Sequence, residues 1–443
     1  MPALPGRRTQ RAHLAQVMLM PMKYTCCFLL AAMLAFGTAL GSDTWPQFRG
    51  PTFNGISDAK NLPLTWDETH NVKWKTEIHG KGWSSPVVWG NQVWMTTATP
   101  DGHELYAVCV DKDSGRIVYD LKLFDIAHPQ YCIPFNSYAS PTPCIEEGRV
   151  YVTFGSPGTA CLDTHTGKVL WTRTDFVCNH YRGAGSSPLL YKNMLIMNFD
   201  GSDHQFVVAL DKQTGKTLWR TERDVDYADL KPDGTPIGDG DFRKAFSTPR
   251  ICNVEGQDRL ISLGSKAIYA YDPFTGRELG RLEIKTSFSG SDTPVCADHM
   301  IFYGTGHGGT ELVAVRPEEP DVLRPSYIIW RSHKHVPTRS SVLVVAGLLY
   351  MTTDAGIATC VDTKTGKEVW HGRIDGDYSA SPIYADGRVY FFSEQGVTTV
   401  LKPGREFKIL AQNPLPDGFM ATPAVVGDAM FLRTRTHLYR VGN

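Results

Sequence analysis

Three kinds of motif are missing from this sequence: the Cys-x-x-Cys pair, the Cys-x-x-Cys-His motif of attached haem, and the Asn-x-Ser/Thr sequon. Basic charge is not in excess either, because 45 Lys and Arg residues stand against 46 Asp and Glu residues, for a formal net charge of −1. The missing cysteine motifs argue against a cysteine-based metal site and against attached haem. The balanced charge argues against a nucleic-acid partner, which requires a basic surface. The missing sequons favour a bacterial source.

The first forty residues have the composition of an export signal. Basic residues between positions 7 and 23 precede an apolar run over residues 26–40, and small residues follow that run. The run is too short to span a bilayer, so the pattern predicts a secretory signal peptide over residues 1–41, cut near Gly41. Cys26 and Cys27 stand at the start of the run and not at the cut, where a lipid would be attached. We therefore expect an exported protein, periplasmic or secreted, without a membrane anchor.

Eight cysteines remain after the predicted cut. Cys109, Cys161 and Cys360 each stand two residues before the aspartate of a repeated motif, where other copies have Ala209 or Ala270. A position shared by Ala and Cys is small and buried, and a free cysteine behaves there as a small hydrophobe. Export permits one disulfide among the five irregularly spaced cysteines, which are Cys132, Cys144, Cys178, Cys252 and Cys296.

The repeated motif has nine residues. Residues 211–219 read DKQTGKTLW, residues 111–119, 163–171 and 362–370 are close copies, and residues 272–280 are a copy without the final aromatic. An apolar run precedes an Asp that can bind the backbone ahead of it, and a Gly that can adopt positive φ leads into the next run. This pattern predicts a tight β-hairpin. Because one hairpin cannot bury its own face, the repetition predicts stacked repeats.

A second marker, small polar residues followed by Pro, sets the length of each repeat. It falls at Pro86, Pro141, Pro188, Pro249, Pro294, Pro382 and Pro423, and Ser340-Ser341-Val342 is a copy without Pro. Each marker precedes a short strand, a turn with Gly and further strands. Four strands per repeat at this spacing are typical of a β-propeller blade. In the second copy, Ala139-Ser140-Pro141 is taken as the marker.

The two ends of the chain complete each other. The run around Trp74 has the pattern of an outer strand without inner strands before it, whereas the last repeat has inner strands without an outer one. Pairing Trp74 with the strand around Leu438 closes the ring and removes its open edges. We therefore predict an all-β fold: an eight-bladed β-propeller of four-stranded antiparallel blades over residues 71–443. Residues 42–70 are predicted to form an extended strap across the surface.

Residues 209–219, ALDKQTGKTLW, resemble the signature of the pyrroloquinoline-quinone (PQQ) repeat. The stretches WPQFRGP at residues 45–51 and LPLTW at 62–66 are similar to exported bacterial propellers of this group. The resemblance implies the eight-bladed propeller of quinoprotein alcohol dehydrogenases, shared by a cofactor-free lipoprotein of the outer-membrane barrel-assembly machinery. In the dehydrogenases PQQ stacks between a Trp and a disulfide of adjacent cysteines, cations hold its carboxylates, and Glu, Asn and Asp hold Ca²⁺. The adjacent cysteines of this chain are Cys26 and Cys27, inside the predicted signal peptide.

Propeller connectivity separates two faces. The connections from each outer strand to the next inner strand share one face with the turns between second and third strands. The long connections, at residues 122–138, 172–185 and 221–246, fall on this face. Because loops on a rigid scaffold carry function, we predict that ligands bind there. Its candidate residues are Asn136, Tyr138, Tyr181, Arg182, Lys244, His335 and Arg339 on the connections, with Asp200, Asp203, His204, His307, Asp354, Glu394, Arg433 and Arg435 on the turns.

Two interpretations of these residues stay open. In the first, bases and acids of neighbouring blades pair and form a solvated ring of charges around a wet channel. In the second, they line a funnel that binds an anionic or polyhydroxylated ligand. Asp200, Asp203 and His204 offer oxygen and nitrogen ligands to a calcium ion, but such a run is more often a turn between strands. We predict no metal site.

For function, two hypotheses from different classes follow. The first is a non-catalytic binding module for a protein or glycan partner, monomeric and without a cofactor, that acts through the face of Arg182, Lys244 and Arg339. The second is a PQQ-dependent alcohol or sugar dehydrogenase with an atypical site for PQQ and Ca²⁺, as the resemblance implies. A hydrolase or lyase comes third, because no separable pair of carboxylates is evident.

Overall fold

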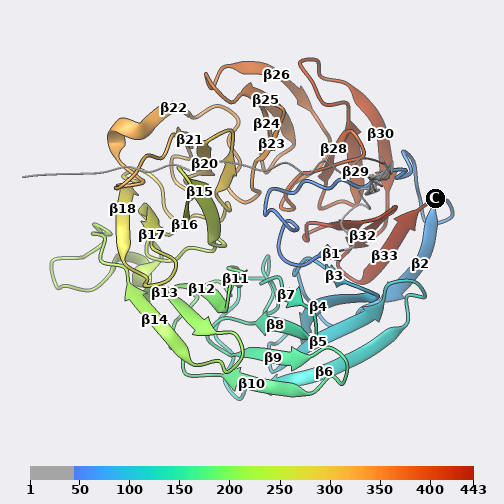
Figure 1. The fold of residues 1–443 in the computed structure, drawn as a ribbon, viewed down its shortest axis with the longest axis horizontal. Coiled ribbons are helices and arrows are strands. Elements are labelled where there is room, and N and C mark those ends of the chain that lie inside the picture. The colour runs from blue at the N-terminus through green and yellow to red at the C-terminus, as the bar shows by residue number, and fades with distance from the viewer. Residues whose placement is uncertain (1–43) are drawn as a thin grey trace, which may run out of the picture. The chain divides into compact units, whose positions relative to one another are not determined.

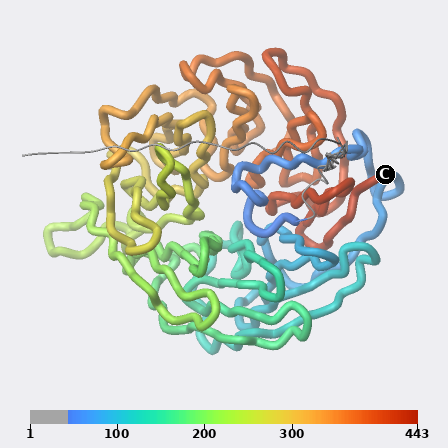
Figure 2. The backbone as a smooth tube through the Cα atoms, in the orientation of Figure 1, coloured from blue at the N-terminus to red at the C-terminus, as the bar shows by residue number. Residues whose placement is uncertain are grey.

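The computed structural model describes residues 44–443, and the predicted signal peptide lies outside this range. In the described residues, eight antiparallel sheets follow one another around a ring (Figure 1). The tube in Figure 2 shows that the chain visits them in cyclic order. Helix is limited, in this part of the chain, to two short 3-10 turns, η1 (Ile237–Gly240) and η2 (Pro325–Tyr327), and no helix there could cross a membrane. The prediction of an all-β, eight-bladed propeller is confirmed.

Blades 1 to 4 each run from an innermost to an outermost strand. Their strands are β3 (Val87–Trp89), β4 (Gln92–Ala98), β5 (Glu104–Asp111) and β6 (Ile117–Asp125); β7 (Cys144–Glu146), β8 (Arg149–Thr153), β9 (Thr159–Asp163) and β10 (Val169–Arg173); β11 (Leu189–Tyr191), β12 (Met194–Asp200), β13 (Gln205–Asp211) and β14 (Thr217–Glu222); and β15 (Arg250–Val254), β16 (Gln257–Leu263), β17 (Ala267–Tyr271) and β18 (Glu278–Glu283).

Blades 5 to 7 follow the same order. Their strands are β19 (Val295–Ala297), β20 (Met300–Gly304), β21 (Leu312–Val315) and β22 (Ile328–Ser332); β23 (Leu343–Val345), β24 (Leu348–Thr352), β25 (Ile357–Asp362) and β26 (Glu368–Arg373); and β27 (Ile383–Ala385), β28 (Arg388–Phe392), β29 (Val397–Leu401) and β30 (Ile409–Pro414). The middle strands are almost fully buried on both faces, since each blade is covered by its two neighbours.

Blade 8 is built from both ends of the described chain. It consists of β31 (Ala424–Val426), β32 (Ala429–Arg433) and β33 (His437–Gly442), and β2 (Val72–Glu77) is its outer strand. In the ladder between β2 and β33, Trp74 lies opposite Arg440 and Thr76 opposite Leu438. The predicted closure of the ring is confirmed.

The repeated aromatics join each blade to the next on the outside of the ring. The indole Nε1 of Trp74 donates to the carbonyl of Lys112 at 3.0 Å, on the hairpin that contains Gly115. A Cβ on Gly115 would lie 2.7 Å from the Trp74 ring, and φ of Gly115 is +74°, so the motif requires glycine there for space and for conformation. Trp171, Trp219 and Trp330 dock in the same way on Lys212, Pro273 and Thr363.

A second set of hydrogen bonds joins the blades around the axis. At seven of the eight blade junctions, a Ser or Thr hydroxyl just before the inner strand accepts the backbone N–H of the equivalent residue in the preceding blade, at 2.9–3.1 Å. The donor and acceptor residues of this hydroxyl ring are Ser85, Thr142, Ser187 and Thr248, then Thr293, Ser341, Ser381, Thr422 and again Ser85. Each bond satisfies a buried N–H that no strand pairs, which explains the small polar residues of the marker.

The hydroxyl ring corrects the marker assigned to blade 2. Thr142 and not Ser140 holds the ring position, because β7 begins at Cys144, two residues after Thr142. The sequence offers Pro on both sides of Thr142, and only the strand register distinguishes them.

Between blades 4 and 5 the links differ: Ser247 Oγ donates to the carbonyl of Asp292 at 2.7 Å, and a disulfide joins Cys252 to Cys296. The prediction of one disulfide among the five irregular cysteines agrees with this pair.

The first half of the strap, residues 44–56, is folded into successive tight turns and lies inside the ring, not extended across the surface. The side chains of Trp45 and Arg49 are 1% and 0% exposed. Residues 44–56 reach the inner part of every blade, because the axis is the one place from which a short segment can touch all eight. β1 (Thr44–Trp45) pairs with β3 of blade 1, and Trp45 belongs to one core cluster with Val425 of blade 8. In blades 2 to 7 the residues beside the strap are, in order, Ile145, Leu189, Arg250, Cys296, Val342 and Tyr384, and Phe53 is the strap residue that clusters with Leu189.

The second half of the strap covers blades 7 and 8. The Leu62 amide donates to Asp386, and the Trp66 amide donates to Asn413. The Trp66 ring is buried and stacks on Tyr390. Asp386 lies on the turn between the first and second strands of blade 7, on the face opposite the long connections, whereas Asn413 belongs to the outer strand β30.

Candidate functional site

The face of the long connections opens into a funnel on the ring axis. The cavity measures about 390 Å³. Seven hydroxyl-ring residues line it, and Phe48 of the strap also contributes to its wall. Further around it come side chains of the long connections and turns: Trp83, Ile133, Phe135, Asn136, Ser140, Arg182, Phe246, Ser291, His307, Arg339, Ser379 and Met420. The funnel therefore combines aromatic surfaces, a ring of hydroxyls and a few basic groups.

Four of the predicted residues line the cavity. They are Asn136, Arg182, His307 and Arg339. Asn136 is held in place because its Nδ2 donates to the carbonyls of Arg182 and Ala184, and its Oδ1 accepts from Ser140. Burial lowers the pKa of His307, so its imidazole is held in the neutral form more readily than a free one.

Arg339 is the best-anchored basic group of the lining. Its guanidinium lies 3.0 Å from Glu394 Oε1 and 3.2 Å from Asp354 Oδ2. Ser379 Oγ donates to Glu394 Oε1 at 2.7 Å, and the guanidinium carbon stacks 4.4 Å from the centre of the Phe135 ring. A basic residue on a connection thus pairs with acidic residues on the turns of its own blade and of the next blade. This agrees with the interpretation in which bases and acids of neighbouring blades form a ring of paired charges. Both acids lie behind the arginine and do not line the cavity.

Arg182 and Lys244 lie on different connections but contact the same carboxylate, that of Asp241. Arg182 NH2 lies 3.2 Å from Asp241 Oδ1, and the Lys244 ammonium contacts the same carboxylate. Lys244 is 1% exposed and lies over the rings of Tyr181 and Phe288, so it supports the wall instead of facing a ligand. Arg182 is exposed and keeps its guanidinium at the cavity.

Asp200, Asp203 and His204 do not converge on a cation. Asp200 is buried and pairs with buried Arg223 at 3.1 Å, and burial raises the pKa of Asp200 to about 6 against the pull of that arginine. Asp203 is exposed, and its Oδ1 accepts the amides of Asn179 and His204. These bonds are those of a turn between β12 and β13, the alternative that the sequence favoured over a calcium site.

The structure places two more predicted residues away from the cavity wall. Arg433 is 2% exposed and donates to the carbonyl and hydroxyl of Ser84, and burial lowers its pKa to about 9. Tyr138 packs against Gly102 and donates to the carbonyl of Gln130. Both side chains hold connections in place.

Sequence reasoning missed the apolar part of the lining. Phe48 comes from the strap, and Trp83, Phe135, Phe246 and Met420 come from four different connections. Single aromatics in loops have no periodic signal, and the search of the sequence was limited to polar residues. A usable signal was the position of Trp83, directly before the first marker on a segment that must reach the axis.

A buried pair below the funnel was also missed. Arg49 donates to the carbonyls of Val342 and Asn54, and its charge pulls on the pKa of Asp292. Burial is the larger influence and raises the pKa of Asp292 to about 7, although the Gly304 amide donates to its Oδ2 at 2.6 Å. Burial also lowers the pKa of Arg49 to about 10.

Fold and site together define a class: an eight-bladed propeller of PQQ-like repeats with one mouth closed by its own N-terminal strap and the other open. The family model described as "Outer membrane protein assembly factor BamB" matches residues 106–245 and 264–406, well over half of the chain. The chain belongs to this family. No curated protein matches the sequence.

Solved structures share the fold at low sequence identity. A europium-containing methanol dehydrogenase matches with a TM-score of 0.67 and 14% identity, covering 88% of this chain and 90% of its own. BamB from Moraxella catarrhalis matches with 0.56 and 12%, covering 83% and 99%. A quinohemoprotein alcohol dehydrogenase from Comamonas testosteroni matches with 0.63 and 13%, covering 90% and 81%. Likeness at this identity establishes the fold, which both enzymes and an assembly factor use.

The lining does not match the PQQ site that the resemblance implies. No Asp or Glu is among the lining residues of the described chain, so a calcium ion would have no carboxylate ligand facing the cavity. The disulfide joins two cysteines that are not adjacent in sequence, and neither lines the funnel. Cys296 lies instead at the strap, where its carbonyl accepts from Asn54. The residues present therefore provide neither the metal cage nor the disulfide of that site.

Proposed function

We propose that this protein is an exported, non-catalytic binding module that takes a polyhydroxylated ligand, a glycan, into the funnel. The observation that carries the proposal is the lining: aromatic side chains and hydroxyls around a cavity of about 390 Å³, with no carboxylate facing it in the described chain. Pockets of this size with apolar walls and a few fixed polar groups are suited to small ligands or ligand ends. We further propose that the protein is periplasmic or secreted, as the signal-like N-terminus predicts. We also propose that it is a monomer.

Each part of a sugar has a counterpart in the lining. The exposed ring of Phe135 and the ring of Trp83 offer apolar faces for the C–H faces of a pyranose. A hydroxyl that already accepts an N–H still has its own proton to donate, so the hydroxyl ring offers donors to sugar oxygens. Arg182 and Arg339 add charged donors, which also accommodate a carboxylate on an acidic sugar.

The PQQ-dependent dehydrogenase remains the second candidate because two of the structural matches are dehydrogenases. It would use the same funnel, and it would require PQQ and Ca²⁺ to bind without the carboxylates and the adjacent cysteines described for that class. Thermal unfolding with PQQ and Ca²⁺ distinguishes the candidates. A ligand that binds only the folded state raises the midpoint, so a rise of several degrees would overturn the glycan proposal.

The direct test is calorimetric titration of the full chain with a panel of neutral and acidic oligosaccharides. We expect binding to at least one of them, weakened tenfold or more by Trp83→Ala and by Phe135→Ala. Tyr131→Ala is the matched control, because Tyr131 is 66% exposed on the same connection as Phe135 but lies outside the funnel lining. If no sugar binds and a polypeptide co-purifies in a Trp83-dependent way, the ligand is a protein and the glycan proposal is wrong.

A further inference from the structure

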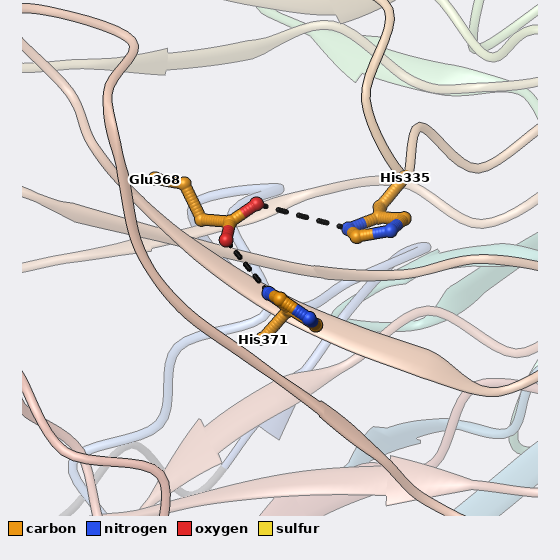
Figure 3. Close-up of side chains that lie close together, drawn as sticks. All are labelled: His335, Glu368 and His371. Atoms are coloured by element: carbon orange, nitrogen blue, oxygen red, sulfur yellow. Dashed lines mark hydrogen bonds and ion pairs between the residues drawn. The ribbon is translucent and has the colours of Figure 1, made fainter.

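Two histidines and a glutamate meet at the outer edge of blades 5 and 6, apart from the funnel. Figure 3 shows the imidazoles of His335 and His371 next to each other, each directed at a different oxygen of the Glu368 carboxylate. His335 lies on the connection that leaves β22, whereas Glu368 and His371 belong to β26. One ligand atom from each residue can be chosen so that all three lie within 4.8 Å of one another.

A β-bulge brings the two β26 residues to the same side. In a regular strand, residues three apart point to opposite faces. Here Glu368 pairs with Val361 and Trp370 with Cys360, so Val369 is an extra residue without a partner in β25. The bulge shifts the alternation by one, which leaves Trp370 in the core and aligns Glu368 with His371.

The atoms between the three residues have few other partners. His335 Nδ1 is shielded from solvent and makes no hydrogen bond, and it lies 3.8 Å from Glu368 Oε2, whose partner is the Lys334 ammonium at 2.8 Å. His371 Nδ1 lies 2.7 Å from the other oxygen, Oε1. Zinc binds imidazole nitrogen and carboxylate oxygen at about 2.0–2.2 Å, so two such ligands on one ion lie about 3–4 Å apart. Small rotations of these side chains would meet that requirement.

We propose that His335, Glu368 and His371 form a binding site for a divalent transition-metal ion of the Zn²⁺ type. Two imidazoles and one carboxylate are a donor set that suits zinc, and three protein ligands leave a further position for water. The site was missed from the sequence because His335 and Glu368 are 33 positions apart by number, on different elements.

Lys334 is the present counter-ion of the carboxylate. Its Nζ lies 2.8 Å from Glu368 Oε2, and its side chain is 60% exposed. An exposed lysine gives up such a contact at little cost, because surface ion pairs contribute little to stability. A bound metal ion would repel the ammonium and displace it into solvent. Removal of Lys334 should therefore strengthen metal binding.

The test is calorimetric titration of chelator-treated full chain with ZnCl₂. We expect one site that His335→Ala and His371→Ala each weaken at least tenfold, and that Lys334→Met strengthens several-fold. His333→Ala is the matched control: His333 is exposed, two residues from His335, and its nearest acid is Glu311 at 3.6 Å. It should leave the affinity unchanged.

A second readout keeps the result independent of folding. Co²⁺ should bind at the same site and give visible absorption bands, lost in the His335→Ala/His371→Ala double variant. Unchanged thermal midpoints of the metal-free variants would show that they fold. The proposal is overturned if the wild type takes up no zinc at millimolar concentration, or if the double variant binds it equally well. The site shares no residue with the funnel lining, so neither outcome bears on glycan binding.

Discussion

The central channel is closed at one mouth, by the strap, and open at the other, the funnel, and the side chains at the two mouths differ. At the strap mouth, residues 44–56 contact the inner part of all eight blades and place Trp45 and Arg49 where they are almost fully buried. At the funnel mouth, aromatic and basic side chains of separate connections surround a cavity. One mouth is therefore built like a protein core and the other like a ligand site.

The difference separates stability from binding. Close-packed interiors respond strongly to the loss of a side chain, whereas half-exposed groups at a cavity respond weakly. The strap mouth should thus determine the free energy of unfolding, and the funnel mouth should determine which ligand binds.

The largest effect is expected from Trp45→Ala. The indole is buried between the inner strands of blades 1 and 8, so its removal leaves a large cavity and should lower the free energy of unfolding by about 3–5 kcal/mol. Denaturant unfolding measures this change. Leu64→Ala on the same strap is the control, because Leu64 is 38% exposed and should cost far less. Equal costs would show that the strap does not act as core.

The next effect concerns Asp292 and depends on pH. Its folded-state pKa of about 7 lies above the ordinary value of 3.8, so the folded protein retains a proton that the unfolded chain loses. This contribution is fully present below pH 4 and is lost as the pH rises to about 7. Asp292→Asn should remove a decline of a few kcal/mol over this window. Unfolding free energies measured at several pH values test it, and parallel profiles for the two proteins would contradict it.

Loss of the disulfide should cost slightly less. Cys252 and Cys296 are 44 residues apart and join blades 4 and 5 beside the strap. Replacing both by Ser should lower the free energy of unfolding by about 2–4 kcal/mol, chiefly because the unfolded chain gains freedom. Cys132→Ser is the control, since Cys132 is free and half-buried. If the variant with Cys252 and Cys296 replaced had the same thermal midpoint as the Cys132→Ser control, the disulfide would not be a stabilising contact.

The smallest effect on stability is expected from Trp83→Ala. The indole is half-exposed, and its Nε1 donates to the carbonyl of Phe135 at 2.9 Å. Its removal should cost about 1 kcal/mol or less, the usual loss for one partly exposed hydrogen bond. The same variant should weaken ligand binding tenfold or more. A cost near that of Trp45→Ala would show that the two mouths are not different in kind.

The sequence determined the blades, because each repeat carries its own local instructions. Asp211 caps its hairpin turn, Gly215 adopts positive φ, and Trp219 reaches the next hairpin, all within nine residues. The same local chemistry in each copy made the number of blades readable, and the unpaired strand around Trp74 made the closure readable. Arg182 and Arg339 could be placed at the funnel because they lie on connections whose face follows from topology.

Only the tertiary structure decided what fills the two mouths. Whether a Pro-rich strap lies on the surface or enters the axis depends on the width left between eight blades, which no local pattern records. The aromatic lining and the His335, Glu368 and His371 cluster join residues from distant connections or across a bulge. Such groupings arise from the packing of blades around the ring, because the physical interactions that create them act between residues that are far apart in the chain.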